Sequence, residues 1–220
     1  MAGNPLNAKV VGRLSLYRRL VSGLIRRGTM AVYSHELASH AGVTAAQVRR
    51  DLMSIGFTAT PSRGYDLTEL ARTLDRFLDS AAAEATVLIG VGNLGRAILA
   101  YFQGQGKLPI IAAFDTDPSK VGRMVHGCPC RPLAELSSVL AERRPRVAIL
   151  TLPASEAQAI ADQLIAGGVR GLVNFAPIPL RVPPGVHLES LDITMFLEKT
   201  AYFARLAVAR EESHEHEGSR

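Results

Sequence analysis

The chain has 220 residues, 47% of them hydrophobic, which is enough for the cores of one or two small domains. No apolar run approaches the roughly 20 residues of a membrane span, and the N-terminus lacks the apolar segment of a signal peptide, so we expect a cytoplasmic protein. The net charge of +5 is uneven, because residues 1–65 hold nine Lys and Arg against two acidic residues. This asymmetry is typical of a nucleic-acid-binding module joined to a part that does not bind nucleic acid, although a solvated basic face is an alternative.

Residues 9–27 carry apolar side chains at helical spacing, and Gly28 is placed to end that helix. Ser34 is a candidate N-cap for a short second helix that runs to Ala38. These two segments predict the start of a small helical domain.

The next segment completes a helix-turn-helix pattern. Gly42 suits a tight turn, and Thr44 to Gln47 reads as a capping box that opens a third helix. Val48 and Leu52 share one face of this helix, which leaves its polar side chains for the major groove. The residues that we expect to contact DNA are Ser34, Thr44, Gln47, Arg49, Arg50, Ser54 and, from the next loop, Arg63.

The segment FTATPSRGY, residues 57–65, combines Thr, Pro, Ser and Gly around Arg63 and predicts a hairpin tip between two short strands, which is the wing of a winged helix. Residues 67–85 predict a further helix with an alanine-rich exit. We place a domain boundary near residue 83, so that residues 1–83 form the winged-helix domain.

Strands and helices alternate after this boundary. Strands are expected at 86–90, 109–115, 146–152 and 171–175, and helices at 95–103, 132–142 and 154–166. Such alternation predicts an α/β domain, a doubly wound parallel sheet covered on both faces, over residues 84–190.

The motif G-x-G-x-x-G follows the first of these strands and opens a helix, which is the context of a dinucleotide-binding loop. Its glycines permit the tight turn, the approach of backbone to the pyrophosphate, and close helix–strand packing. A glycine turn that serves packing alone is the alternative. The residues concerned are Gly90, Val91, Gly92, Asn93, Leu94 and Gly95.

Asp115 ends the next strand, 20 residues after Gly95, where a carboxylate can accept a hydrogen bond from the ribose 2′-hydroxyl. Because it would also repel a 2′-phosphate, it favours NAD(H) over NADP(H). Lys120 and Arg123 lie nearby in sequence and leave that choice open.

The second domain shows few candidate catalytic residues. It has no Tyr-x-x-x-Lys motif, and its histidines before the last helix are His126 and His187. Cys128 and Cys130, the only cysteines, have a spacing that fits neither a zinc site nor a C-x-x-C redox motif, although a thiol switch stays open. A dinucleotide site with few candidate catalytic residues, joined to a DNA-binding module, predicts a sensor that is not an enzyme and holds no metal.

Residues 192–210 predict a helix rich in Phe, Leu and Ala that lies outside the strand–helix alternation and needs an apolar partner surface, from its own domain or from another subunit. We expect the charged tail, residues 211–220, to be disordered, with His214 and His216 solvated rather than bound to metal.

Over roughly residues 10–208 the sequence resembles the Rex family of redox-sensing repressors. The matching motifs, in order, are RLSLYRRL, ELASHAGVTAAQVRRDL, GVGNLGRAILAY, FDTDPSKVG, NFAP and Leu191-Asp192. The resemblance implies a homodimer whose C-terminal helix, residues 191–210, swaps onto the partner, and which binds an inverted-repeat operator and is released by NADH. It also places two segments near the nicotinamide, Thr151-Leu152-Pro153 and Asn174-Phe175-Ala176-Pro177.

The resemblance further implies a switch in which Asp192 pairs with Arg19 in the DNA-binding form and with Tyr101 in the NADH form. Asp192 is also suited to cap its own helix. The wing departs from the family pattern G-x-F-G-K/R-x-G-x-G-Y, since this chain reads GFTATPSRGY, so the operator sequence stays open. Two alternatives stand beside this hypothesis: an NAD-dependent enzyme or CoA-binding module with a basic appendage, and a regulator whose second domain has lost its ligand and serves only dimerisation.

Overall fold

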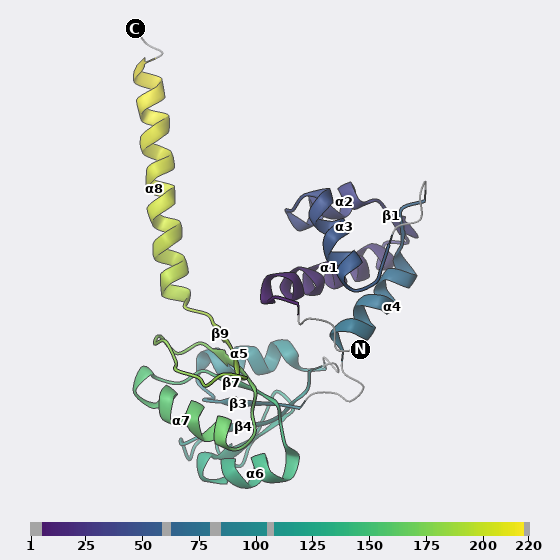
Figure 1. Ribbon diagram of the computed structural model, residues 1–220. Coiled ribbons are helices and arrows are strands. Elements are labelled where there is room, and N and C mark those ends of the chain that lie inside the picture. The colour runs from purple at the N-terminus through teal and green to yellow at the C-terminus, as the bar shows by residue number, and fades with distance from the viewer. Residues whose placement is uncertain (1–5, 59–62, 80–84, 105–107, 218–220) are drawn as a thin grey trace. The chain divides into compact units, whose positions relative to one another are not determined.

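The computed structural model describes residues 6–58, 63–79, 85–104 and 108–217, with side chains to residue 208. The chain divides into two compact units, Met1–Ala82 and Ala83–Arg220 (Figure 1). Each unit has its own hydrophobic core.

The first unit contains four helices and one pair of short antiparallel strands among its described residues. In chain order these are α1 (Ala8–Arg26), β1 (Ala31–Val32), α2 (Ser34–Ala41), α3 (Ala45–Ser54), β2 (Tyr65–Asp66) and α4 (Leu67–Leu78).

Side chains of the first unit fix where its helices begin and end. Thr44 caps α3 as expected, since its Oγ1 accepts a hydrogen bond from the Gln47 N–H at 3.2 Å. The prediction for Ser34 was wrong: Tyr33 is the N-cap residue of α2, and the Glu36 carboxylate accepts its N–H at 2.7 Å. The second helix continues past Ala38 to Ala41 and ends at Gly42, whose φ of 65° lies in the left-handed region that favours glycine.

The strand pairing differs from the expected hairpin. Tyr65 and Asp66 pair with Val32 and Ala31, which precede the helix-turn-helix, and not with residues 57–58. Phe57 is buried in the core and forms no strand, and residues 59–62, the expected wing tip, lie outside the described residues. Gly64 is required here, because a Cβ atom would lie 2.7 Å from the Val32 carbonyl oxygen.

The helix expected over residues 67–85 ends at Leu78, and Asp79 is extended. Asp79 and Ser80 have low helix propensity, which explains the early end. The region around residue 83 lies outside the described residues.

The second unit is built on a seven-stranded sheet in the order β5-β6-β4-β3-β7-β8-β9, parallel except for β5. Its elements are β3 (Thr86–Ile89), α5 (Asn93–Phe102), β4 (Ile110–Asp115), β5 (Met124–Val125), β6 (Cys128–Pro132), a 3₁₀ turn (Leu133–Glu135), α6 (Leu136–Arg143), β7 (Val147–Leu150), α7 (Ala154–Ala166), β8 (Gly171–Asn174), β9 (His187–Ser190) and α8 (Ile193–Glu217).

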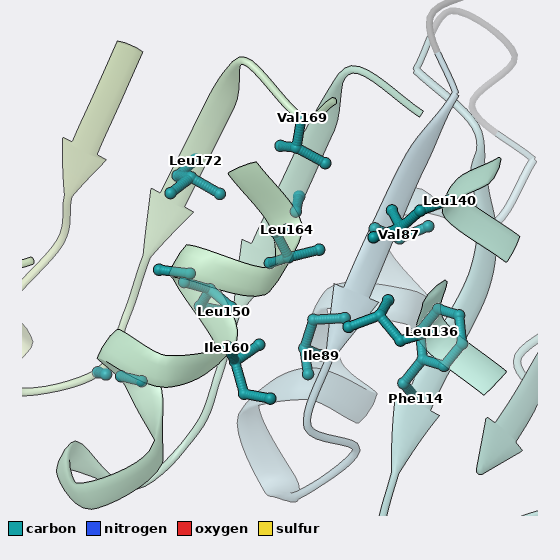
Figure 2. Packing of buried hydrophobic residues seen from close by; sticks show 14 of the residues in the cluster. Val87, Ile89, Phe114, Leu136, Leu140, Leu150, Ile160, Leu164, Val169 and Leu172 are labelled. Atoms are coloured by element: carbon teal, nitrogen blue, oxygen red, sulfur yellow. The ribbon is translucent and has the colours of Figure 1, made fainter. Parts of the chain in front are cut away.

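Helices cover both faces of this sheet. Leu140 of α6 and Leu164 of α7 pack with Val87, Ile89 and other sheet residues in one cluster (Figure 2). Helix α5 lies on the other face (Figure 1), where Leu99 packs with Leu88 and Ala113. The chain runs outward from β3 in one direction through β4 and β6 and in the other through β7, β8 and β9, as the doubly wound prediction requires. Ligands of such sheets bind beyond the carboxyl ends of the two strands where the direction reverses, here β3 and β7.

The last helix is longer than expected. It begins at Ile193 and continues to Glu217, so the prediction of disorder over residues 211–220 was wrong for residues 211–217. The reason is local, since Gly218 is the first glycine or proline after Ile193. Every described side chain of α8, residues 193–208, is exposed. Among the described helices, none is long and apolar enough to cross a membrane.

Candidate nucleotide pocket and DNA-binding surface

A pocket of about 410 Å³ lies beyond the carboxyl ends of β3, β4 and β7. Six residues expected to bind cofactor line it: Gly90, Gly92, Asp115, Thr151, Leu152 and Pro153. Sequence reasoning did not assign six others to it: Ile89, Phe114, Thr116, Lys120, Leu133 and Glu156. Of these six, the sequence indicated only Lys120, as a cation close to Asp115 at the end of the strand.

The glycine loop is held tightly against the neighbouring strand. A Cβ atom on Gly90, whose φ is 94°, would lie 2.5 Å from the Thr151 carbonyl oxygen, and one on Gly95 would overlap the Gly90 carbonyl oxygen. Thr151 fixes the same loop, because its Oγ1 donates to the Gly90 carbonyl at 2.6 Å. Gly90 and Gly95 therefore serve the packing of the loop.

Gly92 differs from these two glycines, because a Cβ atom there would meet no protein atom within 4 Å. Gly92 lines the pocket and is the N-cap residue of α5, and a glycine there offers no side-chain acceptor to the N–H groups of the first turn. The first N–H groups of a helix attract anions such as phosphate. The open space at Gly92 therefore fits a pyrophosphate, and packing alone does not account for a glycine at this position.

Asp115 lies at the opposite end of the pocket from the loops of β7. One carboxylate oxygen accepts the Val91 N–H at 2.7 Å and the Lys120 ammonium at 3.1 Å, and the other accepts the Asp117 N–H at 2.8 Å. Burial acts to raise the pKa of Asp115, but these hydrogen bonds outweigh it and lower the pKa below its ordinary value. Asp115 is therefore ionised near neutral pH, and its carboxylate lines the pocket.

Several expected cofactor residues do not line this pocket. Val91 contributes its backbone N–H to Asp115, Gly95 lies under the loop, and Asn93 and Leu94 are exposed in the first turn of α5.

The segment after β8 is organised by Asn174. Its amide donates to the Ile178 carbonyl at 2.9 Å and its Oδ1 accepts the Ala176 N–H at 3.0 Å, so the buried side chain shapes its own loop. Ala176 is buried, Phe175 is half-buried and Pro177 is exposed. The role expected of residues 174–177 near the nicotinamide stays a prediction.

The two cysteines, Cys128 and Cys130, lie on β6 with Pro129 between them, and both are buried. Burial, with the neighbouring Cys130 thiol, raises the pKa of Cys128 to about 11, so this thiol is protonated at neutral pH and poorly reactive. In the described part of the chain, no group of three or more His, Cys, Asp or Glu could hold a metal ion.

The third helix presents its arginines to solvent. Val48 and Leu52 are buried, and Arg49 and Arg50 are exposed on other sides of α3. The Ser34 hydroxyl accepts a hydrogen bond from Arg49 at 2.9 Å, and Gln47 Oε1 accepts one from Arg50 at 2.9 Å. Thr44, Ser54 and Arg63 are also exposed in the same unit.

Sequence reasoning missed the buried carboxylate of Asp51, whose side chain on α3 is only 2% exposed. Its two oxygens accept hydrogen bonds from Arg13 at 2.6 and 2.8 Å, from the Tyr17 hydroxyl at 2.9 Å and from the Gln47 amide at 2.7 Å. Burial opposes ionisation, but these partners together lower the pKa of Asp51. The network ties α3 to α1 and, through Gln47, orients Arg50.

The three residues expected to form the switch are divided between the units. Arg19 is exposed on α1 of the first unit, and Tyr101, on α5 of the second, is 67% exposed and packs edge-on against Phe102. Asp192 caps α8, since its Oδ1 accepts the Met195 N–H at 3.0 Å. The capping role of Asp192 is thus confirmed, and its pairing with Arg19 or Tyr101 stays a prediction.

Two family models match this chain. The model described as "Putative DNA-binding protein N-terminus" covers residues 7–52, and the "CoA binding domain" model covers residues 82–178. The first match includes α1 through most of α3, and the second includes the glycine loop and the pocket.

Solved structures of a Rex-family repressor, RSP, resemble the chain along its length. One, in complex with β-NAD⁺ and operator DNA, is 28% identical, covers 96% of this chain and 97% of its own, and has a TM-score of 0.85. Another, in complex with β-NADH, is also 28% identical, with coverages of 96% and 99% and a TM-score of 0.82.

Curated relatives are similar at higher identity. The redox-sensing transcriptional repressor Rex of Rhodopirellula baltica is 42% identical over 199 residues, which cover 90% of this chain and 84% of the relative. Rex of Chloroflexus aggregans is 37% identical over 207 residues, which cover 93% and 95%. With a DNA-binding unit, a dinucleotide pocket and relatives of this identity, the chain belongs to the Rex family of redox-sensing transcriptional repressors.

Proposed function

We propose that this protein is a homodimeric repressor that binds an inverted-repeat operator and leaves it when its nucleotide pocket takes up NADH. The observation that carries the proposal is the pairing, in one chain, of the open pocket at Gly92 with a third helix whose exposed arginines are held in place. A bound dinucleotide supplies the redox signal, and the residues of the chain hold it and transmit its state.

Each end of the pocket has its own role. The first turn of α5, at Gly92, binds the pyrophosphate, and Asp115 accepts the ribose 2′-hydroxyl. These groups are common to the oxidised and reduced nucleotides, so they cannot distinguish them. Discrimination belongs to the nicotinamide end, for which we nominate Thr151 to Pro153 and Asn174 to Pro177.

The C-terminal helix supplies the dimer interface. Its exposed apolar side chains are unfavourable in contact with water, and a second copy of the chain would bury them. They are Ile193, Met195, Phe196, Leu197, Tyr202, Phe203, Leu206 and Val208.

An enzyme or a CoA-binding module is the alternative, favoured by the name of the family model over residues 82–178. His126 and His187 do not line the pocket, and its ionisable lining consists of Asp115, Lys120 and Glu156. A regulator binds nucleotide without turning it over, whereas an enzyme would consume NADH in the presence of its substrate.

The test is a DNA mobility-shift titration. The protein first selects its operator from a pool of randomised inverted repeats, and the complex is then measured across a series of NADH/NAD⁺ ratios. We expect binding at a low ratio, release at a high ratio and a complex of two chains per duplex. Binding that ignores the ratio would exclude sensing, and failure to bind NADH would favour a ligand-free second domain.

We predict that Arg49 and Arg50 carry operator binding, one at a guanine edge and the other at a phosphate. Replacing the base-reading arginine with alanine should cost about 1–3 kcal/mol and relax specificity at one base pair, while loss of the phosphate contact should weaken all sequences and reduce the salt dependence. Arg72→Ala, at an exposed position on α4, removes the same charge and is the control. Unchanged binding and salt dependence in both variants would contradict the assignment.

We also predict that Asp192 and Tyr101 couple nucleotide to DNA. A coupling of about 1–3 kcal/mol would change operator affinity about 5- to 150-fold on NADH binding. Tyr101→Phe should still bind NADH but release the operator less completely, because it loses the hydroxyl that pairs with Asp192 in the NADH form. Asp192→Asn should also bind NADH but hold the operator more weakly without it, because it loses the charge that pairs with Arg19. Separate NADH and DNA titrations measure both effects. The cap of α8 requires only the Oδ1 acceptor of residue 192, and asparagine has the same acceptor. If both variants release DNA like the parent, only the capping role of Asp192 survives.

A further inference from the structure

The loop that joins β8 to β9 has little main-chain support of its own. Residues 175–186 form neither helix nor strand. Four of these twelve residues are prolines, which have no N–H group to donate: Pro177, Pro179, Pro183 and Pro184. The position of this loop therefore depends on side chains that hold it.

The start of the loop lies beside the end of β7. The Phe175 N–H donates to the Leu150 carbonyl at 2.9 Å, and Leu150 is the last residue of β7. The two segments that we nominate for the nicotinamide, residues 151–153 and 174–177, are therefore adjacent. In the proposed function, their relative position sets the shape of the nicotinamide site.

The later part of the loop is held by the side chain of Gln158, a partly buried residue on the second turn of α7. Its Oε1 accepts the Arg181 N–H at 2.9 Å, and its Nε2 donates to the Arg181 carbonyl at 3.1 Å. Nε2 also donates to Asp162 Oδ1 at 2.8 Å, one turn further along α7, and this bond orients the amide. One side chain thus pairs with both main-chain groups of a single loop residue.

Apolar packing supports the same attachment but does not define it as sharply. Leu180, next to Arg181, is buried and belongs to the same hydrophobic cluster as Ile160 of α7, and Ile178 packs against that cluster. Such packing is not directional, whereas hydrogen bonds weaken steeply when they are misaligned. The paired hydrogen bonds of Gln158 therefore fix the register of the loop on the helix.

Helix α7 connects this attachment to the pocket. It begins at Ala154, directly after residues 151–153, and Glu156 in its first turn lines the pocket. Because the hydrogen bonds of a helix keep one turn fixed relative to the next, Gln158 holds the loop in a defined position relative to the start of α7.

We propose that Gln158 is a positioning residue for nicotinamide discrimination: by fixing the loop between β8 and β9 on α7, it holds the two nicotinamide segments at the separation that distinguishes NADH from NAD⁺. Gln158 does not line the pocket, so it acts through the residues that it holds. The pyrophosphate and ribose ends, at Gly92 and Asp115, are built by other elements and do not depend on it. This inference rests on the proposed function.

The test compares the parent with Gln158→Met, which keeps the length of the side chain but forms neither hydrogen bond to Arg181. Nicotinamide fluorescence gives the Kd of NADH, and displacement of NADH gives those of NAD⁺ and ADP-ribose. We expect the ratio of the NAD⁺ and NADH Kd values to fall about fivefold, which corresponds to about 1 kcal/mol, the contribution of one hydrogen bond. ADP-ribose, which lacks the nicotinamide, should bind as it does to the parent.

The matched control is Gln163→Met on the same helix. The Gln163 amide donates to Ser137 Oγ of α6 at 3.1 Å, so this variant also loses a contact between elements, but not one to the loop. It should leave all three Kd values unchanged. Hydrogen exchange in peptides from residues 175–186 should be faster in Gln158→Met and parental in Gln163→Met, because only the first variant releases the loop.

An unchanged ratio of the NAD⁺ and NADH Kd values in Gln158→Met would overturn the role of Gln158. Equal weakening of all three nucleotides would also overturn it, because the residue would then support the fold of the pocket as a whole. A parent that binds NADH and NAD⁺ equally would overturn the proposed function, and this inference with it.

Discussion

Replacing Gly95 with alanine is expected to weaken NADH binding strongly and to destabilise the second unit. The added Cβ would overlap the Gly90 carbonyl oxygen and lie 3.0 Å from Thr151 Oγ1. Because the obstacle is backbone, α5 must move away from β3, which displaces the helix N-terminus from the pocket. Overpacking costs of about 3 kcal/mol correspond to roughly 100-fold weaker binding. Nucleotide fluorescence and thermal unfolding measure the two effects.

Two other glycines separate packing from ligand contact. Gly92→Ala meets no protein atom within 4 Å, so it should keep the parental unfolding temperature and still weaken NADH, because the methyl group enters the space of the pyrophosphate. Gly12→Ala, on α1 of the other unit, is likewise unobstructed and should affect neither NADH nor the pocket. Parental NADH affinity in both Gly92→Ala and Gly95→Ala would place the nucleotide elsewhere.

Local patterns predicted the elements that build the pocket. The glycine motif and the strand before it lie within ten residues, and Asp115 follows at a fixed spacing, so the strand ends of β3 and β4 could be identified without tertiary information. Helix α7 was predicted with the bounds that it has, Ala154–Ala166, since Pro153 precedes it and Gly167 follows. Strand β7, which precedes the Thr151 that contacts the glycine loop, was also predictable because its residues are all apolar.

Features that depend on long-range contacts were not predicted. Strand β9 reads His-Leu-Glu-Ser, with three polar residues out of four, and it is a strand only because β8 pairs with it. Strand β2 finds its partner in β1, 34 residues earlier, so no local hairpin signal revealed it.

Asp51 is the clearest example of a feature that depends on long-range contacts. In sequence it stands beside two exposed arginines and looks like a third solvated charge, since the side chains that bury it, Arg13 and Tyr17, lie 38 and 34 residues away. In the structure it is the group that joins α1 to α3. The contribution of Asp51 to stability and its contribution to DNA recognition can be measured separately.

Asp51→Asn should destabilise the first unit by about 3 kcal/mol, because it leaves Arg13 without its ion pair and places an amide donor among donors. The figure is at the lower end of the range for broken buried pairs, since Arg13 is 24% exposed. Hydrogen exchange in peptides from residues 6–58 measures this loss of stability in the first unit separately from the second. The lowered pKa of Asp51 means that the parent keeps this stability above about pH 4 and loses it as pH falls through the folded pKa. Asp51→Asn should show less of that acid dependence.

Operator binding gives the decisive readout for Asp51. Removing a negative charge from a DNA-binding helix should by itself strengthen binding to DNA, because the surface becomes more positive. If Asp51 instead positions Gln47 and, through it, Arg50, the variant should bind the operator at least about tenfold more weakly and lose discrimination against a mismatched site. Glu69→Gln, an equally sized neutralisation at an exposed position on α4, is the control and should bind with parental or slightly higher affinity. Tighter binding by Asp51→Asn, with specificity retained, would show that the carboxylate holds the unit together without orienting the residues that read DNA.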